Sequence, residues 1–111
     1  MPNENFQPIL DKLQSEVTNL ALVTFQNYKN EAKTDALKLL DDMKENLKTW
    51  TLQLANGELS KDDFEFLVLA QKELIEMHAL KQAGISLIQT DEFKNSLLNL
   101  LTKTILGFIK L

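Results

Sequence analysis

The residues that could carry chemistry in this chain are few and far apart. The sequence contains one histidine, His78, and no cysteine, which excludes thiol catalysis, thiolate zinc sites and sites needing two imidazoles from one chain. No glutamate stands three residues before His78, so the di-iron motif of helical bundles is absent. His78 falls on an apolar line with Leu74, and this spacing favours a packed or interface histidine over a catalytic one.

Hydroxyl and carboxylate groups offer no better arrangement. None of the serines has a histidine and an acid beside it in motif form, and the glycines stand alone rather than in a phosphate-binding loop. One acidic cluster is accompanied by lysines on a solvent-facing helix side, and another suits the positive end of a helix. We therefore predict no enzyme activity and no catalytic, cofactor-binding or metal-binding residue. The two clusters are Asp41, Asp42 and Glu45, and Asp62, Asp63 and Glu65.

Composition favours a single all-α domain over residues 1–111. The hydrophobic fraction is 44% and the charged fraction is 25%, as in ordinary globular proteins. Only three glycines and two prolines are present, which favours a few long helices over a sheet with many hairpins. The first residues, MPNENFQP, have neither the basic nor the apolar region of a secretory signal, so we expect a cytoplasmic protein.

The charged residues argue against a nucleic-acid partner. All twelve basic residues are lysines, so the bidentate contacts that arginine makes with guanine and phosphate are absent. The net charge of -4 repels a phosphate backbone. The last nineteen residues differ from the rest, because they hold three lysines and no acid.

A long helix is predicted over about 8–55. Neither glycine nor proline occurs between Ile9 and Asn56, and the apolar residues recur at intervals of three and four in an eleven-residue repeat. An alternative is a break within residues 26–35, where amides and Thr34 could cap a second helix. The apolar stripe comprises Ala21, Phe25, Tyr28, Ala32, Ala36, Leu39, Met43, Leu47, Trp50 and Leu54.

Two further helices follow a predicted turn at about 56–60. Gly57 suits a helix stop, and Ser60 with Asp63 three residues later resembles a capping box. The second helix is predicted over about 61–89, with Gly84 as an earlier possible end. The third is an amphipathic helix over about 91–110, for which Thr90 is the expected cap.

The predicted lengths point to a helical hairpin that needs other chains. At 1.5 Å per residue, a helix over 8–55 would span about 72 Å, whereas a compact chain of this size has a radius of gyration of about 13 Å. The apolar side of the third helix covers about half of its circumference, so it needs at least two neighbours or a membrane surface. We therefore expect a coiled-coil-like bundle, completed by oligomerisation.

The predicted function is that of a non-enzymatic scaffold, assembly or adaptor protein. Its expected partner is a second copy of the chain or another helical protein. An alternative is a membrane-active or lipid-binding protein that uses the C-terminal amphipathic helix. The interface candidates are the large apolar residues of both stripes: Phe25, Tyr28, Leu39, Met43, Leu47, Trp50, Leu54, Leu97, Leu101, Ile105 and Phe108.

Overall fold

The computed structural model describes residues 2–109, and its architecture is all-α, as predicted. No strand occurs within this range. The elements in chain order are α1 (Pro2–Thr24), the 3₁₀ turn η1 (Gln26–Tyr28), α2 (Lys29–Ala55), α3 (Lys61–Ala70), the 3₁₀ turn η2 (Gln71–Leu74), α4 (His78–Gln82) and α5 (Leu87–Ile109).

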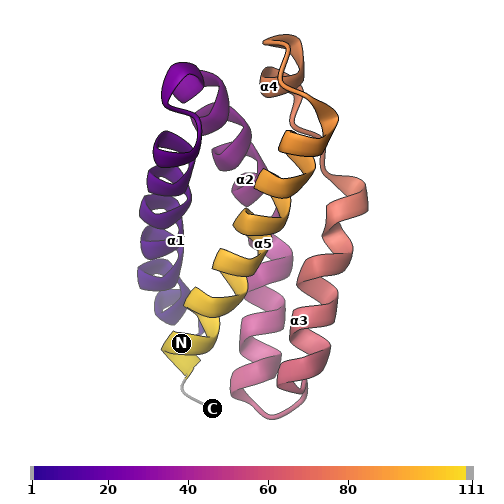
Figure 1. Ribbon diagram of the computed structural model, residues 1–111. Coiled ribbons are helices and arrows are strands. Elements are labelled where there is room, and N and C mark those ends of the chain that lie inside the picture. Colours follow the sequence, from indigo (N-terminus) through magenta and orange to yellow (C-terminus); the bar gives the residue numbers. More distant parts are fainter. Residues whose placement is uncertain (1, 110–111) are drawn as a thin grey trace.

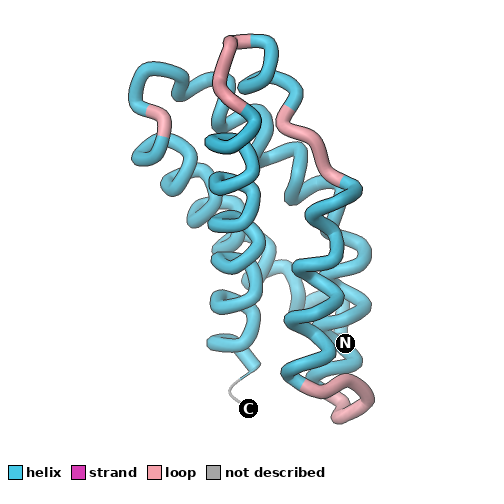
Figure 2. Tube along the Cα trace, turned by 45° about the vertical axis from the view of Figure 1, so that its right-hand side comes forward, coloured by secondary structure: helices cyan, strands magenta, loops and turns pink. Residues whose placement is uncertain are grey.

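Helices α1, α2, α3 and α5 run up, down, up and down in a bundle, and the short α4 lies at the end where α5 begins (Figure 1). The start of α1 and the end of α5 lie toward the opposite end, as Figure 2 also shows. Helix α5 packs against α1, α2 and α3. The longest dimension is 43 Å and the radius of gyration is 14.0 Å, so the chain contains no helix of about 72 Å as predicted for residues 8–55.

The prediction of a continuous helix over 8–55 is wrong because the chain turns back between α1 and α2. Phe25 and Tyr28 leave the helical conformation on either side of η1, with φ/ψ of -122°/74° and -134°/44°. The surrounding stretch, residues 23–30, is rich in β-branched, aromatic and asparagine residues, which are weak helix formers. The break therefore falls at the start of the segment identified as an alternative, but Thr34 lies inside α2 and caps nothing.

Tertiary packing stabilises this break. Folding α1 back onto α2 buries the apolar stripes of the two helices against each other, which offsets the lost helical hydrogen bonds. Phe25 is buried at the turn, and its ring meets that of Phe93 on α5 edge-on, with centroids 5.0 Å apart. The turn is thereby fixed against the last helix.

The turn between α2 and α3 is confirmed. Helix α2 ends at Ala55, and Gly57 adopts a φ of 77°, which L-residues with a side chain rarely adopt. The Ser60 hydroxyl accepts a hydrogen bond from the Asp63 backbone N–H at 3.0 Å, as a helix N-cap does. Local sequence chemistry alone accounts for this hairpin turn.

The predicted helix over 61–89 is also interrupted, at a place without glycine or proline. Ile75 is extended, with φ/ψ of -112°/134°, and it lies between η2 and α4. Ile75 and Met77 both place their side chains in the core. A second interruption follows α4, where Gly84 has a φ of 93°, consistent with the earlier helix end considered at this glycine.

Helix α5 begins four residues earlier than predicted. The Ser86 hydroxyl, rather than Thr90, caps it by accepting a hydrogen bond from the Gln89 backbone N–H at 3.1 Å. Thr90 lies inside the helix and donates to the Leu87 carbonyl at 2.9 Å. The predicted last helical residue, Lys110, lies outside the described residues.

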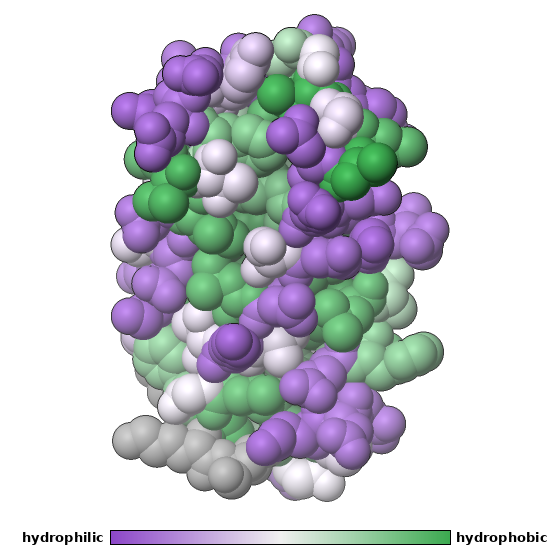
Figure 3. All heavy atoms as spheres, viewed as in Figure 1, coloured by the Kyte–Doolittle hydropathy of each residue, from purple (hydrophilic) through white to green (hydrophobic). Residues whose placement is uncertain are grey.

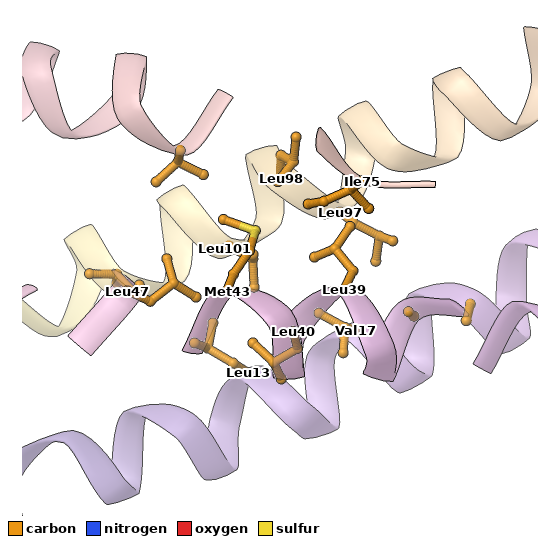
Figure 4. Packing of buried hydrophobic residues seen from close by; sticks show 14 of the residues in the cluster. Leu13, Val17, Leu39, Leu40, Met43, Leu47, Ile75, Leu97, Leu98 and Leu101 are labelled. Carbon is orange, nitrogen blue, oxygen red and sulfur yellow. The ribbon is translucent and has the colours of Figure 1, made fainter. Parts of the chain in front are cut away.

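The buried apolar residues form one cluster between the helices. In Figure 4, Leu13 and Val17 of α1 face Leu39, Leu40 and Met43 of α2, and the leucines of α5 close the cluster from the other side. Most of the predicted apolar stripes are therefore covered within a single chain. The length argument for oligomerisation loses its basis, and self-association stays an untested prediction.

Candidate functional site

Asp35 on α2 is a buried acid with a defined structural partner. Its carboxylate is 4% exposed and accepts hydrogen bonds from the backbone N–H groups of Ala79, at 3.0 Å, and Leu80, at 2.8 Å. These N–H groups lie in the first turn of α4, where no carbonyl of the same helix is available to them. Asp35 therefore caps a helix more than forty residues away in the sequence.

Lys94 on α5 is a buried basic residue that also bonds to backbone groups. The residue is 9% exposed, and its ammonium group donates hydrogen bonds to the Lys72 carbonyl, at 3.0 Å, and to the Ile75 carbonyl. Both acceptors belong to the place where the chain leaves η2. The charge is compensated by carbonyl dipoles instead of by an acid.

Asp35 and Lys94 together hold the segment between α3 and α5 in its non-helical path. Each charged group makes two hydrogen bonds to backbone groups of this segment, which indicates a structural role. The sequence carried a signal for both, since Asp35 lies on the apolar stripe between Ala32 and Leu39, and Lys94 lies one turn before Leu98 on the apolar side of its helix.

The other residues considered for chemistry are exposed and separate. His78 is the first residue of α4 and lies on the surface, with its Nε2 3.9 Å from a carboxylate oxygen of Glu76. Of the packed or interface position predicted for it, the packed one is therefore wrong, and the interface one stays a prediction. Asp41 and Asp42 form exposed ion pairs with Lys44 and Lys38 on α2, as the solvent-face interpretation predicted. Within the described range, no three histidine or acidic side chains come together in a group that could hold a metal ion.

An apolar pocket of about 220 Å³ lies between the beginning of α1 and the ends of α2 and α5. Thr51 lines it, and the Thr51 Oγ1 has no hydrogen-bond partner among the described residues, although it is buried. None of the described residues that line this pocket is charged. As far as the structure describes it, the pocket is an apolar space with one hydroxyl.

Most interface candidates named from the sequence lie in the core of the single chain. Trp50 is half-buried, and Tyr28 and Phe108 are exposed at the ends of the bundle. Phe108 also lies at the rim of the apolar pocket. The buried candidates are Phe25, Leu39, Met43, Leu47, Leu54, Leu97, Leu101 and Ile105.

Several exposed apolar residues lie instead on α3 and η2, and none of them was among the interface candidates named from the sequence. Phe66 is 71% exposed and Leu74 is 77% exposed, and Leu69 and Ala70 lie exposed between them. We call these four residues the α3–η2 apolar surface. In Figure 3, apolar side chains protrude among hydrophilic ones along the edge where α3 lies in Figure 1.

A sequence signal for this surface existed. Phe64 and Val68 are buried one turn apart and occupy the inner side of α3, so Phe66 and Leu69 must point outward. Helix α3 is thus apolar on two sides. A surface helix needs only one apolar side to pack against the core, so the core does not account for the apolar residues on its second side.

The first turn of α5 adds two more exposed apolar side chains, Leu87 and Ile88. Elsewhere on α5 the large apolar residues from Phe93 to Ile105 are buried or half-buried in the bundle. No helix in the described part of the chain has both the length and the apolar character needed to cross a bilayer. Comparison of the chain with protein-family models, with curated proteins and with solved structures finds no match.

Proposed function

We propose that this protein is a non-enzymatic adaptor that binds an amphipathic helix of a partner protein on the α3–η2 apolar surface. The observation that carries this proposal is the exposure of Phe66 and Leu69 on α3 and of Leu74 in the adjoining η2, while Phe64 and Val68 of α3 are packed in the core. Soluble proteins seldom leave such a cluster uncovered without a partner. An amphipathic partner helix can contact such a surface through its own apolar residues, which recur at three- and four-residue intervals.

The rigidity of the bundle supports binding without rearrangement. Helix α3 is anchored by Phe64 and Val68 in the core and by the cap at Ser60. Its far end continues into η2, and Lys94 donates hydrogen bonds to the carbonyls of Lys72 in η2 and of Ile75 just after it. The surface is therefore presented in a fixed conformation, which lowers the entropy lost on binding.

The catalytic and membrane alternatives have less support. Asp41, Asp42 and Glu76 each form an exposed ion pair with a lysine, and the described residues that line the apolar pocket offer a single buried hydroxyl, that of Thr51. A membrane role for α5 would require Leu97, Leu101 and Ile105 to leave the core, at a cost of several kcal/mol. We place the protein in the cytoplasm, in keeping with its composition.

A pair of aspartate substitutions tests this proposal. Phe66→Asp places a charge in the α3–η2 apolar surface, and Val23→Asp places the same charge at an exposed apolar residue at the end of α1. Both variants should keep the helix content and the melting temperature of the wild type within a few degrees. The probe is a synthetic helical peptide of about 18 residues with one leucine row, whose binding is measured by calorimetry.

We expect Phe66→Asp to weaken peptide binding by more than about tenfold and Val23→Asp to change it by less than about twofold. Equal losses in both variants would contradict the assignment of the surface. Unchanged binding by Phe66→Asp would contradict the adaptor proposal itself.

A further inference from the structure

The α3–η2 apolar surface is bordered by acidic side chains. Asp62 and Asp63 lie four and three residues before Phe66 in α3, one helical turn away. Glu73 lies in η2, next to Leu74 in the sequence. The structure leaves all three exposed. The surface therefore has an apolar centre with negative charge at both ends.

Among the described residues, no lysine forms an ion pair with these acids. Lys61 is about 140° around the helix from Phe66, and Lys72 is half-buried. The ion pairs within the described range involve other acids, namely Asp41, Asp42 and Glu76. Within this range, the charges of Asp62, Asp63 and Glu73 are exposed and not neutralised by an ion pair.

Resting on the proposed adaptor function, we infer that the partner is a basic amphipathic helix, whose apolar row is flanked by lysine or arginine. Complementary charge at the ends of an apolar contact steers association and fixes the register of the two helices. The same acids oppose binding of a second copy of this chain. In a symmetric pair, antiparallel α3 helices would bring Asp62 against Glu73, and parallel ones would bring Asp62 against Asp62.

Two synthetic helical peptides test this inference on the intact protein. Both carry the same leucine row, and the flanking positions are lysine in one peptide and glutamate in the other. Binding is measured by calorimetry at about 50 mM and about 300 mM salt, because screening weakens contacts between exposed charges. We expect the lysine peptide to bind at least about tenfold more tightly at low salt, and this ratio to shrink at high salt.

A matched pair of charge reversals locates the effect. Glu73→Lys changes a charge at the border of the surface, whereas Glu45→Lys makes the same change on exposed α2, next to α1. Glu73→Lys should weaken binding of the lysine peptide by about fivefold, and Glu45→Lys by less than about twofold. Equal effects of the two reversals would mean that only the net charge attracts the peptide, and would overturn the inference.

The remaining outcomes separate failure of the inference from failure of the proposed function. If the wild type binds both peptides equally and Phe66→Asp binds neither, the α3–η2 apolar surface is the binding site, but the inference of a basic partner helix is wrong. If Phe66→Asp binds the lysine peptide as the wild type does, the adaptor function itself is wrong. If neither peptide binds, and vesicles of phosphatidylcholine and phosphatidylserine bind the wild type but not Phe66→Asp, the surface serves a membrane and both proposals fail.

Discussion

The carboxylate of Asp35 accepts a hydrogen bond from the backbone N–H of Leu80 at 2.8 Å, across 45 residues of sequence. A second bond from the adjacent N–H of Ala79 completes a cap of α4. This relationship joins the middle of α2 to the segment that connects α3 with α5. It explains how the chain tolerates an interruption at Ile75 of the helix predicted over 61–89, without glycine or proline at the break.

Removing this cap should destabilise the fold. Asp35→Ala leaves the buried N–H of Leu80 and the partly buried N–H of Ala79 without acceptors, and we expect it to lower the free energy of unfolding by about 3 kcal/mol. Urea denaturation measures the loss. The control is Asp42→Ala, which removes only an exposed ion pair with Lys38 and should cost less than about 0.5 kcal/mol. Equal losses in the two variants would show that the cap contributes nothing.

Replacing the buried lysine should loosen the same segment from its other end. Lys94→Met keeps much of the side-chain volume but removes the donor to the carbonyls of Lys72 and Ile75. We expect a loss of about 2 kcal/mol and faster hydrogen exchange in the segment between η2 and α5. Lys103→Met, at an exposed position of α5, is the control. Unchanged exchange in Lys94→Met would argue against this role.

Two buried threonines form a matched pair that tests how much a hydrogen bond of the hydroxyl contributes to stability. Thr51 and Thr102 are each 5% exposed, but the Thr102 hydroxyl donates to the Leu98 carbonyl at 3.1 Å, whereas the Thr51 Oγ1 has no partner among residues 2–109. Thr51→Val should leave stability unchanged or raise it by up to about 1 kcal/mol, and Thr102→Val should lower it by about 1 kcal/mol. Thermal melting of both variants measures the difference, and the reverse order would refute it.

The features predicted correctly from the sequence are those that depend on residues close together in the chain. The all-α class follows from the three- and four-residue spacing of apolar residues, and the turn at Gly57 and Ser60 follows from its helix-stop and capping residues. The break at Phe25 was recognised only as an alternative, because apolar periodicity continues through it and packing of α1 on α2 decides the outcome.

The candidate site depended on information that periodicity does not contain. A stripe of buried residues looks the same whether its own chain or another chain covers it, and here the chain covers most of it. The interruption at Ile75 requires contacts from Asp35 and Lys94, which are distant in sequence. The two-sided apolar character of α3, with Phe66 outside and Phe64 inside, could have been found from its sequence.

The mass in solution tests whether a second copy occupies the surface. Because acids border the α3–η2 apolar surface, we expect light scattering at low salt to give the mass of one chain, 12.7 kDa. A dimer that Phe66→Asp converts to monomers would contradict this expectation and place a second copy there. A dimer that Phe66→Asp leaves intact would place self-association elsewhere on the molecule.

Chemical-shift mapping tests the central claim most directly. The lysine-flanked peptide is titrated into isotope-labelled protein, and the backbone amide shifts report which residues it contacts. The adaptor proposal predicts that the largest changes fall on Asp62 to Leu74, in α3 and η2, with little change along α1. Largest changes at the end of α5 around Phe108, or shifts spread evenly over the molecule, would contradict it.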